Sequence, residues 1–554
     1  MSTSHDALIA DARAWLVEDP DPATRDELTA VLAQAENGDA DALADLADRF
    51  SGTLQFGTAG LRGALGAGPN RMNRVVVTRA AAGLLAYLKE QGASSEDSVV
   101  IGYDARYNSD VFARDTAEVV TGAGLKAYVL PRPLPTPLLA YAIRDLGCAA
   151  GVMVTASHNP PQDNGYKVYL GDGSQIVPPA DSGIAAQIDA VGSLADVPRG
   201  DGGVVLGEDV IERYRSCVVD LLPEGPRDLK VVYTAMHGVG GETVTRVLEA
   251  AGFPAPALVE AQFAPDPAFP TVAFPNPEEP GAMDLSLALA EEVDADLVIA
   301  NDPDADRCAA AVRGPQGWRM LRGDEVGALL AHHLLGRSKP GIYATSIVSS
   351  SLLGRLAAAK GQEHRETLTG FKWIGRLEGL AYGYEEALGY CVDPANVRDK
   401  DGVSAALVLC ELAAETKAAG RTLIDVLDDI AREHGLHATD QLSVRFSDLA
   451  GIGAAMERLR STPPTALGGL AVEKVEDLSL GTVDLPPTDG LRYSLAEGAR
   501  VIVRPSGTEP KVKCYLEVVV AVEDETPEAI DAARIAAAGR LDAIKGDVKV
   551  AAGL

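Results

Sequence analysis

The spacing of hydrophobic and polar positions changes along the chain. In the first fifty residues Ala and Leu recur at helical spacing among acidic residues, which predicts helices at 6–16 and 39–50. From position 75, short runs of Val and Ile alternate with longer amphipathic stretches. The predicted order is helix 75–89, strand 98–103, helix 110–121, strand 126–130, helix 137–145 and strand 149–154. This alternation indicates βαβ units around a largely parallel sheet.

The same pattern then restarts twice before the chain changes character. The second run predicts helix 210–222, strand 229–234, helix 241–251 and strand 295–300. The third predicts helix 324–335, strand 341–348, helix 375–380, strand 381–384 and helix 403–419. The last hundred residues predict strands at 441–446, 500–503 and 512–520 and a helix at 527–545, which is typical of an α+β unit. We therefore expect three successive α/β units followed by a smaller α+β unit.

The length of the chain indicates several domains, and its net charge limits the kinds of partner that it can bind. A chain of 554 residues exceeds the roughly 250–300 residues at which single cores stop growing. The net charge of −31 disfavours nucleic acids and anionic membranes as partners, and it requires any phosphate site to be locally basic. Six cysteines are scattered without a CxxC pair, and neither a signal peptide nor an apolar run of about 20 residues is present. These features predict a soluble cytoplasmic protein with reduced thiols.

A serine stands in a turn directly after a strand. The sequence Thr155-Ala-Ser157-His158-Asn-Pro160 follows the apolar run 151–154, at the strand end where α/β proteins place reactive groups. It is not the G-x-S-x-G elbow of hydrolases, because threonine and asparagine occupy the glycine positions. His158 is next to Ser157, so we do not expect a triad base; it could stabilise phosphate charge. Taken alone, the hexapeptide is as compatible with a structural turn.

Three carboxylates follow the predicted strand 295–300. Asp302, Asp304 and Asp306 alternate with other residues and can converge on one hard cation, for which oxygen ligands suit Mg²⁺. An EF-hand is excluded, because Arg307 stands where that loop needs glycine and Arg313 where it needs glutamate. A solvated acidic turn is the alternative, although the carboxylates would repel one another without a cation.

Three further loops carry groups suited to a phosphosugar. Arg504, Ser506, Gly507 and Thr508 offer a guanidinium, hydroxyls and backbone N–H groups to a phosphate monoester. Small residues around Arg62, in Phe56-Gly-Thr-Ala-Gly-Leu-Arg62-Gly, allow close backbone approach to a ligand. The adjacent carboxylates of 385–386 can accept hydrogen bonds from sugar hydroxyls. Each loop alone could be structural, but together with the serine and the metal loop they form one consistent site.

This set of motifs resembles the α-D-phosphohexomutase superfamily. The similarity runs from Phe56 to Lys513, and its most specific part is T-A-S-H-N-P followed by Asn164-Gly-Tyr-Lys167. The resemblance implies an α/β fold with mixed sheets and four domains around a central cleft. We place these domains at 1–207, 208–320, 321–438 and 439–554, the last being a smaller α+β domain.

The resemblance also implies roles for individual residues. Ser157 would be the phosphoserine, and Asp302, Asp304 and Asp306 would bind one Mg²⁺ together with it. The catalytic set would be completed by His158 and Lys167, which assist proton transfer and charge stabilisation, and by Arg62, with Arg307 also at the phosphoryl-transfer site. Residues expected to contact the sugar are Thr369, Gly370, Glu385 and Lys400, and those expected to hold its other phosphate are Arg504, Ser506, Gly507 and Thr508.

The implied reaction interconverts hexose 1-phosphate and hexose 6-phosphate of glucose or mannose. Ser157 would donate its phosphoryl group, a sugar bisphosphate would reorient, and the other phosphate would return; a sugar 1,6-bisphosphate would activate the enzyme. Ala387 departs from many hexose mutases, which have serine there. Together with the motifs at 56–63 and 233–238, this loop is similar to a subgroup that holds bacterial phosphoglucomutase/phosphomannomutase, eukaryotic phosphopentomutase and glucose-1,6-bisphosphate synthase. The last two activities are the alternatives. A silent phosphosugar sensor and a phosphatase are disfavoured, and we expect a monomer or homodimer.

Overall fold

The computed structural model describes residues 5–57, 60–446, 449–483, 485–505 and 511–553. Within these ranges the chain forms two compact units. The first comprises Met1–Met320 and Gly389–Ala414, and the second comprises Leu321–Leu388 and Glu415–Leu554. Helix α15 (Gly402–Ala418) contains the point at which the chain passes from the first unit to the second. Among the described helices, none combines the length and apolar character needed to cross a membrane.

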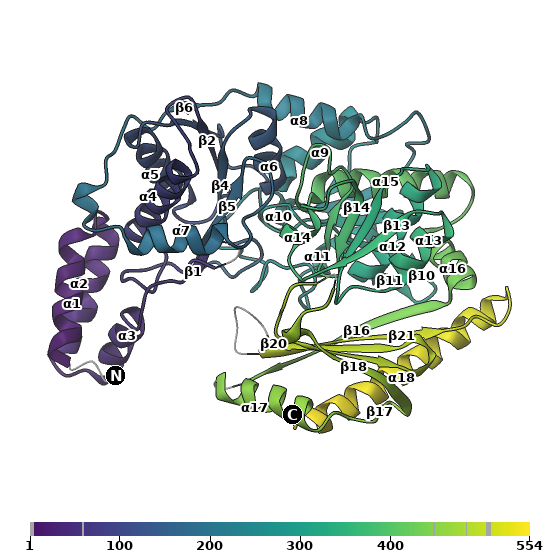
Figure 1. Cartoon of the computed structure of the whole chain (residues 1–554). Helices are drawn as coiled ribbons and strands as arrows, with labels where there is room; N and C mark the ends of the chain where they lie inside the picture. The colour runs from purple at the N-terminus through teal and green to yellow at the C-terminus, as the bar shows by residue number, and fades with distance from the viewer. Residues whose placement is uncertain (1–4, 58–59, 447–448, 484, 506–510, 554) are drawn as a thin grey trace. The chain divides into compact units, whose positions relative to one another are not determined.

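The first unit holds two sheets and their helices (Figure 1). Its helices are α1 (His5–Glu18), α2 (Pro22–Glu36), α3 (Ala40–Arg49), α4 (Arg74–Glu90), α5 (Ser109–Gly122), α6 (Thr136–Asp145), α7 (Ala180–Asp189), α8 (Asp209–Val219), α9 (Gly240–Ala250), α10 (Glu260–Phe263) and α11 (Asp284–Glu292). Its strands are β1 (Leu61–Ala64), β2 (Ser98–Tyr103), β3 (Lys126–Val129), β4 (Ala150–Val154), β5 (Asp163–Leu170), β6 (Val204–Val205), β7 (Val231–Thr234), β8 (Ala257–Leu258), β9 (Leu297–Ala300), β10 (Ala309–Gly314), β11 (Gly317–Met320) and β15 (Gly389–Cys391).

The first sheet has the order β1-β5-β4-β2-β3-β6 and is mixed. Strands β4, β2, β3 and β6 are parallel to one another, whereas β5 is antiparallel to both β4 and β1. Alternate side chains of β2, such as Val99 and Ile101, pack into the core with α4 and α5. On the other face a Cβ at Gly151 would lie 2.4 Å from Ile143 Cδ1 of α6, so only glycine permits this close approach.

The second sheet has the order β11-β10-β9-β7-β8. Strands β7, β8 and β9 are parallel, and β9 turns back into β10 with Ala300 opposite Ala309. The residues between these two strands therefore form the tip of a hairpin whose adjoining strand residues, 297–300 and 309–312, are buried. This hairpin carries the three predicted metal-binding aspartates.

Three helices precede the first sheet. Helices α1, α2 and α3, drawn in purple in Figure 1, contact one another and enclose a small apolar core that includes Trp15, Leu28 and Leu46. Ala67 and Val75, which follow β1, belong to the same core. Asp21 and Asp39 cap α2 and α3 with their side chains, as expected of N-cap residues. We refer to residues 5–50 as the N-terminal module.

The second unit contains a parallel sheet and an antiparallel sheet. Its helices are α12 (Gly323–Gly336), α13 (Leu352–Ala359), α14 (Phe371–Ile374), α16 (Leu423–His434), α17 (Leu449–Ser461) and α18 (Pro527–Ala552). Its strands are β12 (Ile342–Ser346), β13 (Glu363–Thr367), β14 (Leu380–Glu385), β16 (Leu436–Arg445), β17 (Ala466–Leu467), β18 (Leu470–Asp477), β19 (Leu491–Leu495), β20 (Arg500–Pro505) and β21 (Lys511–Val520). Strand β12 pairs in parallel with both β13 and β14.

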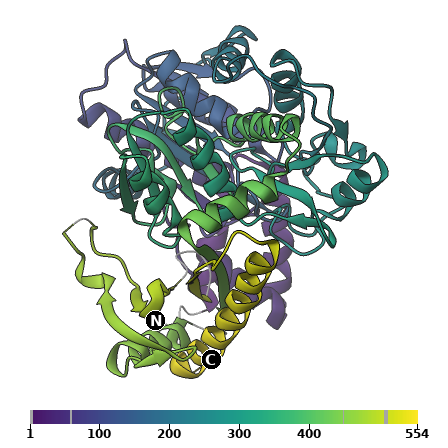
Figure 2. The same cartoon turned by 90° about the vertical axis from the view of Figure 1, so that its right-hand side faces the viewer.

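The C-terminal sheet has the order β16-β21-β20-β19-β18-β17, and its pairings are antiparallel. One face is apolar and packs on α17 and α18, through residues such as Tyr493, Val501 and Leu516. Figure 2 shows α18, in yellow, running along this sheet. Side chains of the other face alternate with these and include Arg500, Arg504 and Glu517 by register.

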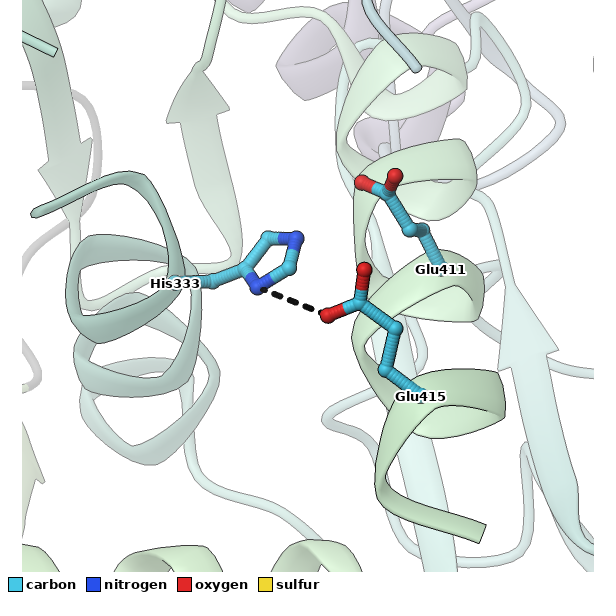
Figure 3. Close-up of side chains that lie close together, drawn as sticks. All are labelled: His333, Glu411 and Glu415. Carbon is cyan, nitrogen blue, oxygen red and sulfur yellow. Dashed lines mark ion pairs between the residues drawn. The ribbon is translucent and has the colours of Figure 1, made fainter. Parts of the chain in front are cut away.

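Helices α12 and α15 are joined by a buried histidine. His333 Nδ1 of α12 lies 3.8 Å from Glu415 Oε2 of α15. Figure 3 marks this pair with a dashed line. Glu411, drawn in the same figure, precedes Glu415 by about one helical turn on α15. This pair attaches α12 to the C-terminal end of α15.

The fold class predicted from the sequence is confirmed: α/β with mixed sheets, followed by an antiparallel sheet with helices. One predicted helix, 375–380, is wrong. The helical turn lies earlier, at α14, because Phe371 and Ile374 are buried there. Gly379 then adopts a φ of 77°, a left-handed conformation that does not continue a helix. Helix α2 was not predicted from the sequence.

Candidate active site

The first unit presents Ser157 at the tip of the β4–β5 hairpin. Ser157 has a φ of 52°, which is uncommon for a residue other than glycine, and its N–H donates to Thr155 Oγ1 at 2.9 Å. Its Oγ donates to Asp302 Oδ2 at 2.8 Å and lies 3.1 Å from His158 Nδ1. The turn therefore directs the hydroxyl to the carboxylate cluster, with an imidazole beside it.

A buried arginine that was not predicted from the sequence, Arg106, holds the backbone of this turn. Arg106 donates to the carbonyl oxygens of Ser157 at 2.6 Å and of Pro160 at 2.8 Å, and also to those of Asn159 and Asp163. It lies 3.4 Å from Asp104, and its guanidinium stacks on Phe269. One side chain thus holds four carbonyl groups of the loop. The one feature of the sequence that could have pointed to Arg106 is its position after β2, in Asp104-Ala-Arg106.

The three aspartates converge as the sequence predicted. One carboxylate oxygen from each of Asp302, Asp304 and Asp306 lies within 4.8 Å of the others, and all three residues are buried. Asp304 Oδ1 and Asp306 Oδ1 find no hydrogen-bond donor in the part of the chain that the structure describes. Buried carboxylate oxygens without donors are costly unless a cation binds them. The cluster therefore fits a hard divalent cation such as Mg²⁺.

Two lysines and a threonine surround the same carboxylates. Lys167 Nζ lies 2.7 Å from Asp304 Oδ2 and 3.0 Å from Asp306 Oδ2, because β5 returns beside β4 with Lys167 opposite Met153. Lys400 Nζ lies 3.2 Å from Asp306 Oδ2. Thr136, the first residue of α6, donates its hydroxyl to Asp304 Oδ2 at 2.6 Å. The predicted sugar-contacting Lys400 thus stands at the carboxylate cluster, and Thr136 was not predicted.

The charges in this cluster shift its pKa values in opposite directions. Burial raises the pKa of Asp302 well above its usual value, and the neighbouring carboxylates of Asp304 and Asp306 add to the rise. Burial also acts on Asp304, but Lys167 outweighs it, so the pKa of Asp304 lies below the usual range. The pKa of Asp306 is lowered as well, against its burial, by Lys167 and Lys400. A cation would stabilise the ionised form of all three.

Two arginines adjoin the serine. The guanidinium of Arg62 donates to Asn159 Oδ1 at 3.2 Å, and the main-chain N–H of Arg307 donates to Asp302 Oδ1 at 3.1 Å. Burial lowers the pKa of His158 well below its usual value, and the positive charges of Arg307 and Arg62 lower it further. The imidazole next to Ser157 is therefore neutral at physiological pH, and the positive charge at the site comes from arginine and lysine.

The remaining predicted residues belong to the second unit. The N–H of Gly370 donates to Glu385 Oε1 at 2.7 Å, so the loops after β13 and β14 meet, with Thr369 beside Gly370. Ser349 Oγ donates to Glu386 Oε2 at 2.9 Å and accepts from the N–H of Glu386 at 3.1 Å, which holds the loop at 385–388. Arg504 is the last residue but one of β20 and lies opposite Lys513. The predicted phosphate-binding residues Ser506, Gly507 and Thr508 lie outside the described residues.

Four family models match the chain in sequence order. They are described as phosphoglucomutase/phosphomannomutase alpha/beta/alpha domains I, II and III and the C-terminal domain. The matched residues are 53–195, 211–316, 322–434 and 443–533. Together these ranges cover well over half of the chain, and the N-terminal module precedes them.

Named relatives and a solved structure agree with these models. A probable phosphomannomutase of Haemophilus influenzae is 52% identical over 80% of this chain and 93% of its own length. A probable phosphoribomutase of Schizosaccharomyces pombe is 37% identical over 91% of this chain and 92% of its own. The crystal structure of a putative phosphomannomutase from Thermus thermophilus is 27% identical, with a TM-score of 0.69 over 88% of this chain and 99% of that one. The chain is therefore a phosphosugar mutase, an isomerase that belongs to the phosphoglucomutase/phosphomannomutase family.

Proposed function

We propose that this protein interconverts hexose 1-phosphates and hexose 6-phosphates of glucose, mannose or both, through a phosphorylated Ser157. The observation that carries the proposal is the hydrogen bond of 2.8 Å from Ser157 Oγ to Asp302, within a cluster of three buried carboxylates. A serine meant for acyl transfer would need a general base and an oxyanion site rather than a cation site. A phosphoryl carrier needs a cation beside it.

The residues of the first unit then have distinct roles in phosphoryl transfer. The free hydroxyl of the sugar monophosphate attacks the phosphorus and releases its proton, the bond from phosphorus to Ser157 Oγ breaks, and Ser157 Oγ takes up a proton, so that one proton is released and one is gained. His158, 3.1 Å from Oγ, and Lys167 assist in moving protons and balancing charge. Arg62 and Arg307 neutralise the transferred group. Positioning and charge neutralisation supply most of the catalysis in such reactions.

Asp302, Asp304 and Asp306 would hold one Mg²⁺ together with an oxygen at Ser157. When bound, this cation withdraws charge from the phosphoryl group and lowers the barrier to its transfer. The two aspartate oxygens without hydrogen-bond donors support this assignment.

The second unit would select the sugar and its other phosphate. We assign Thr369, Gly370 and Glu385 to sugar hydroxyls, together with Lys400 of the first unit. Arg504, with the loop that follows it, would bind the phosphate that does not react. The bisphosphate intermediate reorients between the two half-reactions, so a sugar 1,6-bisphosphate should prime an enzyme that has lost its phosphoserine. We also propose four domains, at 1–207, 208–320, 321–438 and 439–554, each containing one matched family range.

Initial rates on a substrate panel test the proposal. Glucose, mannose and ribose 1-phosphates are compared, with the phosphorylation of the starting enzyme read from its intact mass. We expect hexose phosphates to be turned over fastest. A clear preference for ribose 1-phosphate would instead favour a phosphopentomutase, an activity consistent with Ala387 and with the named phosphoribomutase relative.

Ser157→Ala tests the phosphoryl carrier. We expect loss of turnover and of the phosphorylated mass, because alanine has no oxygen to carry the group. Ser182→Ala, at an exposed serine of α7, is the matched control and should keep both. Near-normal turnover of Ser157→Ala would refute the mechanism.

A further inference from the structure

The segment that follows β1 binds the N-terminal module through Ala67, and further along through Asn70 and Arg71. Ala67 is fully buried in the apolar core of the N-terminal module. Its N–H donates to Glu27 Oε2 of α2 at 3.1 Å, and its carbonyl oxygen accepts from Arg49 Nη1 of α3 at 3.2 Å. Both hydrogen-bonding groups of one peptide residue are thus held by side chains of the module.

Glu27 and Arg49 also bind each other. Arg49 Nη1 lies 2.7 Å from Glu27 Oε1, and Arg49 Nε donates to Asp45 Oδ1 at 2.9 Å. The Arg49 side chain is only 12% exposed, so its charge is partly shielded from solvent. Because each partner orients the other, the pair presents one donor and one acceptor at the spacing of the Ala67 backbone.

The glycines on either side of Ala67 show how closely the segment enters the module. Gly66 and Gly68 have φ angles of 150° and 107°. A Cβ at Gly68 would lie 3.0 Å from both Arg49 Cβ and Arg49 O, and a Cβ at Gly66 would lie 3.2 Å from Arg49 Nη1. Any other residue would be strained by its backbone conformation and by this contact. The sequence Gly66-Ala67-Gly68 therefore allows the backbone to approach Arg49 closely.

The same segment continues β1, which carries Arg62. In β1, Arg62 pairs with Gly165 of β5, and its side chain reaches Asn159 of the serine loop at 3.2 Å. The N–H of Leu65, one residue after the strand, donates to the carbonyl oxygen of Gln162 in that loop at 2.8 Å. A shift of Ala67 would therefore displace the end of a four-residue strand on which Arg62 stands.

We propose that the N-terminal module is a positioning element for Arg62, acting through the binding of Ala67 by Glu27 and Arg49. The module lies before the ranges matched by the four family models, whereas Ala67 lies within the first of them. Glu27 and Arg49 touch neither the carboxylate cluster nor Ser157; they are positioning residues. The proposal rests on the proposed function, in which Arg62 neutralises the transferred phosphoryl group.

Arg49→Gln in the full-length, phosphorylated enzyme tests the proposal. Glutamine removes the charge and the ion pair with Glu27. Arg13→Gln is the matched control, because Arg13 forms an ion pair of 2.7 Å with Glu36 inside the same module without contacting residues 61–70. Rates on glucose 1-phosphate are normalised to the enzyme molecules that carry phosphoserine by intact mass. Thermal unfolding is recorded for each variant.

A displacement of about 1 Å at a positioning group can reduce a rate about a hundredfold. We expect kcat of Arg49→Gln to fall at least tenfold with KM within about twofold, because Arg62 acts on the transferring group. Arg13→Gln should keep kcat within about twofold of the wild type. Arg49→Lys, which keeps a charge opposite Glu27, should recover part of the lost kcat.

If the wild type is active but Arg49→Gln and Arg13→Gln have equal kcat, the inference about the module is refuted and the proposed function is not. A wild type without mutase activity would instead refute the proposed function. If Arg49→Gln does not fold, Glu27→Gln carries the test. This variant keeps an amide oxygen for the N–H of Ala67 but loses the charge opposite Arg49, so kcat should fall several-fold with unchanged KM; kcat equal to that of Arg13→Gln would overturn the inference.

Discussion

Thr136 offers a selective way to disturb the carboxylate cluster. Its hydroxyl donates to Asp304 Oδ2 at 2.6 Å, and its N–H donates to the carbonyl oxygen of Asp304 at 2.9 Å. Thr136→Val removes the first hydrogen bond and keeps the second, because valine has nearly the same shape. Asp304 would then lose one of the two donors that orient its carboxylate, and we expect the enzyme to require more Mg²⁺.

The size of the effect follows from the contacts. A hydrogen bond to a charged group contributes about 1.5–3 kcal/mol, and each ~1.4 kcal/mol corresponds to a factor of ten. Lys167 still donates to the same oxygen at 2.7 Å, so the lower part of this range applies. We expect the Mg²⁺ concentration for half-maximal activity to rise roughly ten- to thirtyfold. Losses of about 10–100-fold are usual when residues that orient metal ligands are replaced.

The assay measures initial rates on glucose 1-phosphate across a series of Mg²⁺ concentrations. Thr116→Val is the matched control: Thr116 is also fully buried in the first unit, but its hydroxyl donates to two uncharged groups, Phe112 O and Tyr166 Oη. The control should keep the Mg²⁺ dependence of the wild type. The same Mg²⁺ dependence in both variants would refute the reasoning that Thr136 orients Asp304.

Three further predictions concern metal, charge and pH. Chelation of divalent cations should abolish turnover and added Mg²⁺ should restore it; full activity after chelation would contradict the metal site. Arg106→Met should destabilise the protein by about 3–5 kcal/mol in urea unfolding, because it leaves the buried Asp104 without its ion pair; Asp104→Asn in the same chain should recover part of this, and no recovery would contradict the pairing. Burial raises the pKa of Asp324 to about 6, and the neighbouring charges of Glu386 and Glu517 add to the rise against the hydrogen bond from the N–H of Ser350. A carboxyl whose pKa is raised on folding contributes stability that is lost as pH rises from its usual pKa of about 4 to about 6. Between those two pH values, thermal unfolding should therefore show a steeper decline for the wild type than for Asp324→Asn, and parallel curves would contradict it.

Much of the fold could be predicted from residue spacing, and the errors have local causes. Strands β2 and β4 and helix α15 follow their apolar patterns closely, because burial alone decides them. The predicted helix 375–380 failed because Gly379 adopts a left-handed conformation that a hydrophobic pattern does not reveal. Helix α2 was not predicted because few large apolar residues follow its N-cap, Asp21, and its first residue, Pro22.

The candidate site was predictable where its residues are adjacent in sequence. Ser157 with His158, and the three aspartates, lie in short motifs whose chemistry can be read directly. Arg106 and Thr136 were missed because each acts on a loop that is distant along the chain. The position of Lys400 Nζ, 3.2 Å from Asp306 Oδ2, came only from the structure, and its contact with the sugar stays a prediction.

The sequence by itself determined the reactive groups: a serine in a turn after a strand, three carboxylates spaced for one cation, and the family to which these motifs belong. Only the tertiary structure decided which groups surround them. Lys167 reaches Asp304 because β5 turns back along β4, and Thr136 reaches it from the first position of α6 through both its hydroxyl and its N–H. The binding of Ala67 by Glu27 and Arg49 likewise joins residues up to forty positions apart. Spacing along the chain describes local chemistry, whereas contacts between distant residues exist only after the strands have paired and the helices have packed.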